Sequence, residues 1–343
     1  MFTRARLLTF AIALAGVGAF ELLALPLPFL FGPMFACLLA AILGLRMQGA
    51  GQISVAARTV LGVAVGASIT PAILGQVPLM AITLAMIPAY VAVIGLVGVP
   101  FFQRVCGFDR VTSYYAAMPG GFQDMVLFGQ EAGGDPRALS LIHATRVLVI
   151  VTLIPILMTG HFGLSLDQPM GAPARDVPLH EMALMVVIAV VGWKGGERIG
   201  LFGAAILGPL ILATALSLGD ILHHRPPAEA IMAAQFFIGM GIGMQFRGVT
   251  FAELRHDVAA GAAFAVILAL LAGVFTFLAF KIGGAPMLEA FLSFAPGGQA
   301  EMTVLAIVAG ADLGFIVIHH LMRLIVVITG APVMARLIWG KTG

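Results

Sequence analysis

Residues 59–103 read TVLGVAVGASITPAILGQVPLMAITLAMIPAYVAVIGLVGVPFFQ and contain no Asp, Glu, Lys, Arg or His over 45 residues. A helix that crosses the hydrocarbon core of a bilayer needs only about 20 apolar residues. The stretch therefore predicts two crossings. We place the turn between them at Gly75-Gln76-Val77-Pro78, where glycine and proline interrupt the apolar run.

The composition of the whole chain has the same character. Of 343 residues 61% are hydrophobic and 10% are charged, and the mean hydropathy is +1.08, whereas a soluble domain carries about 25% charged residues. A net charge of +2 provides no basic surface, so we expect no nucleic-acid partner. Cys37 and Cys106 are too few for a disulfide scaffold and lack metal-ligand spacing. The lipid bilayer is the expected surrounding.

Hydrophobic segments recur along the chain and predict an all-α integral membrane protein with about 10–12 transmembrane helices. The segment at 180–193 is short, and those at 112–130 and 287–309 are interrupted by Pro-Gly-Gly. The twelve segments are 7–24, 28–45, 57–74, 79–102, 112–130, 138–159, 180–193, 199–218, 230–246, 258–280, 287–309 and 314–338.

Basic residues are distributed unevenly around the first four segments. If those segments cross, all the arginines fall on one side, while the loops at 25–28 and 75–78 are uncharged. Because basic residues favour the cytoplasmic side, we predict a cytoplasmic N-terminus whose apolar run is retained as the first span. Basic residues of the second half do not decide its orientation. The arginines that surround the first four segments are Arg4, Arg6, Arg46, Arg58, Arg104 and Arg110.

The chain also contains an internal duplication. A shift of 177 positions aligns matching Pro, Gly, Asp, His and Arg residues without a gap, which chance repetition of apolar residues would not do. We therefore divide the chain into a first membrane repeat at 1–160, a polar linker at 161–178 and a second repeat at 179–343. The matched pairs are Pro119 and Pro296, Gly120 and Gly297, Gly121 and Gly298, Met125 and Met302, Asp135 and Asp312, His143 and His320, and Arg146 and Arg323.

Duplication with a broken hydrophobic segment in both halves is typical of secondary transporters, whose substrate site lies at the repeat interface. The repeats are parallel if each crosses six times and inverted if one segment only dips into the membrane; we expect inverted repeats, by analogy with transporters that have broken helices. Gly62-x-x-x-Gly66 and its match Gly239-x-x-x-Gly243 predict close helix packing.

These residues resemble the AbrB-type family of duplicated membrane proteins. The resemblance rests on two copies of Ala/Phe-x-Pro-Gly-Gly-x-x-(Asp/Glu)-Met, each followed by Ala-Gly-x-Asp and His-x-x-Arg, and it covers nearly the whole chain. It implies the architecture and a bacterial inner (plasma) membrane location. Members carry labels as different as ammonia monooxygenase, regulator of gene expression and transporter. Copper or iron would need a cluster of His and carboxylate ligands, which His223-His224 and His319-His320 do not supply, so we expect no enzyme and no metal or other cofactor.

Two Pro-Gly-Gly breaks are the first candidate site residues: Pro119, Gly120 and Gly121, and Pro296, Gly297 and Gly298. Proline removes a backbone donor and glycine favours no helix, so backbone groups need partners inside the protein. A substrate or ion site is the functional interpretation, and a simple packing kink is the alternative. Asp124 and Glu301 follow the breaks at equivalent places, where they either couple transport to H⁺ or Na⁺ or stabilise a helix start. Asp135 and Asp312 are predicted helix caps.

His143 and Arg146, with His320 and Arg323, lie inside the spans that follow. An intramembrane arginine must find an anion, either a protein carboxylate such as Asp124 or Glu301 or a substrate. For the histidines a satisfied interior hydrogen bond competes with a proton relay. We therefore predict a secondary transporter of a small anionic solute coupled to H⁺ or Na⁺. The alternative is a membrane ligand sensor that affects gene expression without transport. The solute's identity and the oligomeric state, a homodimer included, are left open.

Overall fold

A computed structural model describes residues 3–71, 75, 77–166, 169–201 and 203–339, apart from the side chains at 123, 336, 338 and 339. Within these residues every regular element is a helix and no strand occurs. The all-α prediction is therefore confirmed for the described part of the chain. Gln76 of the predicted turn and Asp167 of the predicted linker lie outside it.

Six described helical stretches are long and apolar enough to cross a membrane, which indicates a multi-pass membrane protein. Five further apolar helices have only 10–17 residues, and the remaining crossings stay a prediction. Helix α3 shows why the counts differ, because it ends at Gly66 although the apolar segment continues to 74. The six stretches are Arg4–Leu22, Val77–Val105, Pro136–Gly160, Leu179–Arg198, Phe251–Lys281 and Leu313–Ala335.

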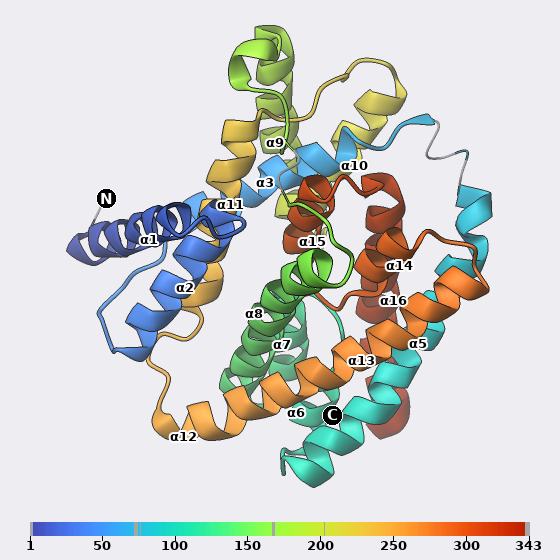
Figure 1. The fold of residues 1–343 in the computed structure, drawn as a ribbon. Helices are drawn as coiled ribbons and strands as arrows, with labels where there is room; N and C mark the ends of the chain where they lie inside the picture. Colours follow the sequence, from blue (N-terminus) through green and yellow to red (C-terminus); the bar gives the residue numbers. More distant parts are fainter. Residues whose placement is uncertain (1–2, 72–74, 76, 167–168, 202, 340–343) are drawn as a thin grey trace. The chain divides into compact units, whose positions relative to one another are not determined.

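The chain forms two compact units, and each takes helices from both halves of the sequence (Figure 1). Unit 1 comprises residues 1–76, 155–249 and 303–314. It contains α1 (Arg4–Leu22), α2 (Pro28–Ile42), α3 (Gln52–Gly66), η3 (Ala174–Asp176), α9 (Leu179–Arg198), α10 (Ala204–Leu218) and α11 (Ala228–Met244).

Unit 2 comprises residues 77–154, 250–302 and 315–343. Its helices are η1 (Val77–Met80), α5 (Ala81–Pro100), η2 (Phe101–Val105), α6 (Arg110–Ala117), α7 (Phe122–Glu131), α12 (Phe251–Glu253), η4 (Leu254–Val258), α13 (Ala259–Lys281) and α14 (Met287–Phe294). It also holds most of α8 (Pro136–Gly160) and α16 (Leu313–Trp339) and the start of α15 (Gln299–Val308).

Glycines let the helices of unit 1 approach one another closely. A Cβ atom on Gly62 of α3 would collide with the carbonyl oxygen of Ile206 in α10, and one on Gly239 of α11 would collide with that of Leu30 in α2. Such contacts place backbone against backbone, which only glycine permits. The predicted close packing at both Gly-x-x-x-Gly pairs is confirmed.

Unit 2 is built around an aromatic core. The rings of Tyr90 on α5 and Phe275 on α13 lie 4.9 Å apart between centroids, and those of Phe102 and Phe264 lie 4.8 Å apart. Figure 1 shows α13 and α5 running beside each other, and α14 also packs on α13. These long helices pack against the short helix that precedes each Pro-Gly-Gly, α5 against α6 and α13 against α14.

Candidate functional site

Both Pro-Gly-Gly stretches belong to unit 2, and each lies between two short helices. Helix α6 ends at Ala117 and α7 begins at Phe122, while α14 ends at Phe294 and α15 begins at Gln299. Met118 and its counterpart Ala295 leave the helical conformation with ψ of 129° and 128°. Proline cannot donate a helical hydrogen bond and paired glycines do not favour a helix. The helix is therefore interrupted at the same place in both halves of the sequence.

Arg146, on α8, holds the first break. Its Nη1 donates to the carbonyl oxygen of Met118 at 3.1 Å and its Nη2 donates to that of Gly120 at 3.1 Å. The residue is 3% exposed. One guanidinium thus satisfies two carbonyl groups of the break, a use that suits the rigid fork of its N–H donors.

Arg323, on α16, holds the second break in the same way. Its Nη1 donates to the carbonyl oxygen of Ala295 at 2.7 Å and its Nη2 donates to that of Gly297 at 2.9 Å. The residue is 5% exposed. Both acceptors lie 177 positions after those of Arg146, as does the arginine itself. These hydrogen bonds join each guanidinium to backbone carbonyls, an acceptor that the sequence prediction did not consider.

The two histidines add a second matched set of hydrogen bonds. His143 Nε2 lies 3.1 Å from the carbonyl oxygen of Tyr115, and His320 Nε2 lies 2.9 Å from that of Leu292. A carbonyl can only accept, so each ring carries its proton on Nε2 at this contact. Both histidines are buried. The geometry therefore accounts for them as interior hydrogen-bond donors to the last turn of α6 and of α14, while a proton relay stays a prediction.

The two arginines share one electrostatic environment. Arg146 lies within range of the charge of Arg323, of the Glu301 carboxylate and of the Tyr90 hydroxyl. Tyr90 is fully buried and donates to the carbonyl oxygen of Phe294, the last residue of α14, at 2.8 Å. Two buried guanidinium groups and one buried carboxylate thus occupy one region of unit 2. Because like charges repel strongly away from water, this region favours an additional anion.

The acidic residues after the breaks occupy the first turns of α7 and α15. Asp124 is half-buried, whereas Glu301 is 9% exposed. The Glu301 carboxylate folds back against Gly298, where a Cβ atom would collide with it. This position suits an anion at a helix start, so the coupling and helix-start interpretations both stay open. Asp135 does cap α8, since its Oδ1 accepts from the backbone N–H of Arg137 at 2.8 Å and of Ala138 at 3.2 Å.

Sequence reasoning missed the role of two methionines at the breaks. Met125 and Met302 are fully buried. A Cβ atom on Gly120 would lie less than 3 Å from the sulfur of Met125, and one on Gly297 would lie less than 3 Å from the sulfur of Met302. The first glycine of each Pro-Gly-Gly is therefore required for this close contact with a methionine. The signal was present, because both methionines match in the duplication. Tyr90 carried no such signal, since the equivalent position 267 is an isoleucine.

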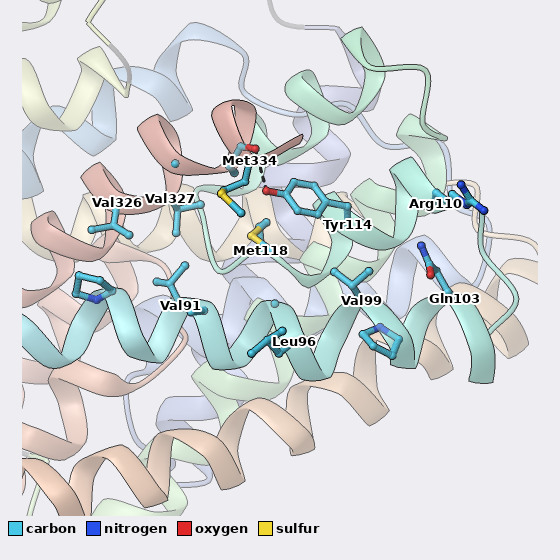
Figure 2. A pocket seen from close by; sticks show the side chains of 16 residues that line it. Val91, Leu96, Val99, Gln103, Arg110, Tyr114, Met118, Val326, Val327 and Met334 are labelled. Carbon is cyan, nitrogen blue, oxygen red and sulfur yellow. Dashed lines mark hydrogen bonds between the residues drawn. The ribbon is translucent and has the colours of Figure 1, made fainter. Parts of the chain in front are cut away.

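A cavity of about 800 Å³ lies beside the first break, between α5, α6 and α16. In Figure 2, Gln103 and Arg110 lie together at one end and Val326 lies toward the other. Tyr114 donates its hydroxyl to the carbonyl oxygen of Ala331 at 2.8 Å, which joins α6 to α16. Most of the lining is apolar. In the part of the chain that the structure describes, no group of three or more His, Cys, Asp or Glu side chains could hold a metal ion.

A family model described as "Transition state regulatory protein AbrB" matches residues 29–339, most of the chain. This chain belongs to the AbrB family. It is 25% identical over 320 residues to a protein of Escherichia coli (strain K12) named "Putative regulator AbrB", covering 92% of this chain and 90% of that protein. It is also 25% identical over 281 residues to "Uncharacterized protein YhjN" of Bacillus subtilis (strain 168), covering 77% of this chain and 70% of that protein. No solved structure matches the chain.

Proposed function

We propose that this AbrB-family protein is a secondary transporter of a small anionic solute. One observation carries the proposal: Arg146 and Arg323 are both buried, lie within electrostatic range of each other and each hold the carbonyl groups of a helix break. Broken helices at matched positions of two halves are the arrangement that transporters use at their substrate sites. The finer architecture belongs to the proposal: 10–12 crossings, two inverted repeats, a cytoplasmic N-terminus and a bacterial inner membrane.

Charge explains why the solute would be an anion. A buried guanidinium is costly unless a negative charge and hydrogen-bond acceptors surround it. The carbonyl groups supply acceptors, but the positive charge of Arg323 acts on Arg146 more strongly than the negative charge of Glu301 does. The Nε of Arg146 is buried and has no hydrogen-bond partner among the described residues. A carboxylate or phosphate group can accept from such an N–H and offset the second positive charge.

The coupling ion belongs to the same proposal. Glu301 is buried and within electrostatic range of Arg146, and Asp124 occupies the matched place 177 positions earlier. A carboxylate in a membrane interior is able to bind H⁺ or Na⁺. We therefore assign coupling to H⁺ or Na⁺ to these carboxylates, with no resident cofactor and with the solute and the bilayer as partners. A homodimer is compatible with this proposal and is not required by it.

A second candidate function rests on the family description. The AbrB family model and the E. coli relative both carry the word regulator or regulatory, which favours a membrane sensor that binds the same anion without moving it. Both candidates use the same arginines. The family names and the apolar, all-helical fold of the described residues point away from an enzyme.

Flux measured beside binding separates the two candidates. The purified full chain is reconstituted into liposomes, and uptake of small organic and inorganic anions is measured under an imposed pH or Na⁺ gradient. A transporter accumulates at least one anion that also shifts the thermal unfolding of the protein. An anion that shifts unfolding but never crosses the membrane in any gradient would instead identify a sensor.

A further inference from the structure

The cavity beside α5 and α16 has the size and chemistry of a ligand site. Its volume of about 800 Å³ falls within the range of about 300–1,000 Å³ typical of small-molecule sites. The lining along its length is aliphatic and sulfur-containing, as at Val91, Leu96 and Met334. Such a surface favours a hydrocarbon chain over a polar solute.

One end of the cavity is polar and basic. Figure 2 places Gln103 and Arg110 together there, and exposed Arg104 follows Gln103 in the chain. Asp109 lies next to Arg110, but its carboxylate accepts the backbone N–H groups of Val111 and Thr112 at 2.9 Å each. The basic end is therefore available to an anionic headgroup whose apolar part lies along the helices.

Two of the side chains that line the cavity are exposed on the outer surface of the protein. Leu96 on α5 is 75% exposed and Met334 on α16 is 49% exposed. Both helices are among those long and apolar enough to cross a membrane. On such helices exposed apolar side chains meet lipid, so the molecules with direct access to this cavity are those dissolved in the bilayer.

We propose that this cavity binds an anionic phospholipid, with one acyl chain between α5 and α16 and the phosphate at Arg110 and Gln103. Basic residues at a membrane surface attract anionic lipids through their headgroups, and the apolar cavity holds the chain. Binding does not depend on the transport proposal. The site does contact the first helix break, because Met118 lines the cavity and its carbonyl oxygen accepts from Arg146.

Glycine offers a way to fill the cavity without disturbing the fold. Gly330 lines it from α16, and a Cβ atom there would meet no atom within 4 Å. Gly330→Leu places a side chain in that space and also favours the helix. Gly273 on α13 is the matched control, because its Cβ would meet open space as well and it is not part of the lining. Arg110→Gln removes the positive charge that would bind the headgroup. Arg255→Gln is the matched control, because Arg255 is exposed and does not line the cavity.

Native mass spectrometry of the detergent-purified full chain tests the proposal with phosphatidylglycerol and with phosphatidylcholine of the same acyl chains. We expect retention of one phosphatidylglycerol, its loss in Gly330→Leu and about fivefold weaker binding in Arg110→Gln. Gly273→Leu and Arg255→Gln should bind as the wild type does. Equal binding of both lipids, or unchanged binding in Gly330→Leu, would overturn the proposal. If the wild type is a dimer that dissociates in Gly330→Leu while lipid binding stays unchanged, the cavity is instead the contact site of a second copy of the chain.

Discussion

The break between α6 and α7 and the break between α14 and α15 have the same hydrogen-bond frame but different surroundings. Each is held by one arginine through two carbonyl oxygens, and each preceding short helix accepts from one histidine. Around the second break, the carboxylate is a buried glutamate and Tyr90 donates to Phe294. Around the first, Asp124 is half-buried and a cavity reaches Met118.

This comparison distinguishes residues that stabilise both breaks from residues that are present at one break alone. Features that recur at an offset of 177 hold the broken helices open, since both copies need the same satisfied carbonyl groups. Features present once are available for a specialised role. We expect the second break to be the centre of ion coupling, and the first to be the break that responds to molecules in the membrane.

Removal of either arginine has the largest expected effect on stability. Arg146→Gln and Arg323→Gln each leave two buried carbonyl groups without their donor, at a cost of about 1–3 kcal/mol per group, so the free energy of unfolding should fall by roughly 2–6 kcal/mol. Exposed Arg255→Gln should change it by less than about 0.5 kcal/mol. Thermal unfolding in detergent measures all three. A large loss of stability in only one of the two variants would mean that the hydrogen bonds of Arg146 and of Arg323 do not have equivalent roles.

Neutralising the carboxylates tests the difference between the breaks. Glu301→Gln should abolish accumulation driven by a pH or Na⁺ gradient while the protein remains folded, because Glu301 is buried and within electrostatic range of Arg146. Asp124→Asn should reduce accumulation less, because Asp124 is half-buried. Uptake into proteoliposomes is compared at several pH values and Na⁺ concentrations. If both variants keep the wild-type pH and Na⁺ dependence, stabilisation of the helix starts is the better account of these residues.

The glycines of the breaks give a smaller effect that should be equal in both copies. Gly120→Ala and Gly297→Ala place a methyl group against Met125 and Met302 and should cost about 1–3 kcal/mol through overpacking. Gly273→Ala, in open space on a helix, should instead stabilise by up to about 1 kcal/mol. Combining Gly297→Ala with Met302→Ala should relieve the collision, because the three atoms nearest to that Cβ all belong to Met302. A neutral Gly120→Ala would remove the sulfur contact as the reason for glycine.

The cap of α8 gives the smallest effect. Asp135→Ala removes an acceptor for two backbone N–H groups and should cost about 1 kcal/mol, whereas Asp135→Asn retains an acceptor and should cost less. Chemical denaturation detects the difference. Equal losses in both variants would show that the charge, rather than the hydrogen bonds, matters at this helix start. Capping by Asp312 stays a prediction.

The sequence located most of the groups at the breaks but not their partners. Matching Pro, His and Arg residues at one offset assigned Arg146 and Arg323, inside the spans that follow, to the same candidate site as the helix breaks. It could not identify the carbonyl acceptors, because backbone carbonyl groups leave no residue pattern and anionic side chains are the expected partners of a buried arginine. Tyr90 was missed because its partner Phe294 is 204 positions away and because position 267, at the offset of 177, is an isoleucine.

The number of crossings was less predictable for a related reason. Hydropathy gives the length of an apolar segment but does not show where the backbone hydrogen bonds of a helix end within that segment. The predicted segment runs from 57 to 74, yet α3 ends at Gly66. The segments at 112–130 and 287–309 are each divided into two short helices. The all-helical, multi-pass character followed from composition, which does not depend on these boundaries.

The central claim is that Arg146 and Arg323 bind an anionic solute between the breaks. The most direct test measures uptake by double variants that lack one arginine and one carboxylate. Arg146→Gln with Glu301→Gln, and Arg323→Gln with Glu301→Gln, are reconstituted beside the wild type and assayed for accumulation of an anion that the wild type moves, because Glu301 is the carboxylate within electrostatic range of Arg146. If the arginines serve the solute, both double variants fold but remain inactive, because removing a fixed carboxylate does not restore the lost contact. If both doubles recover binding and uptake, the arginines only neutralise the carboxylates, and the claim is contradicted.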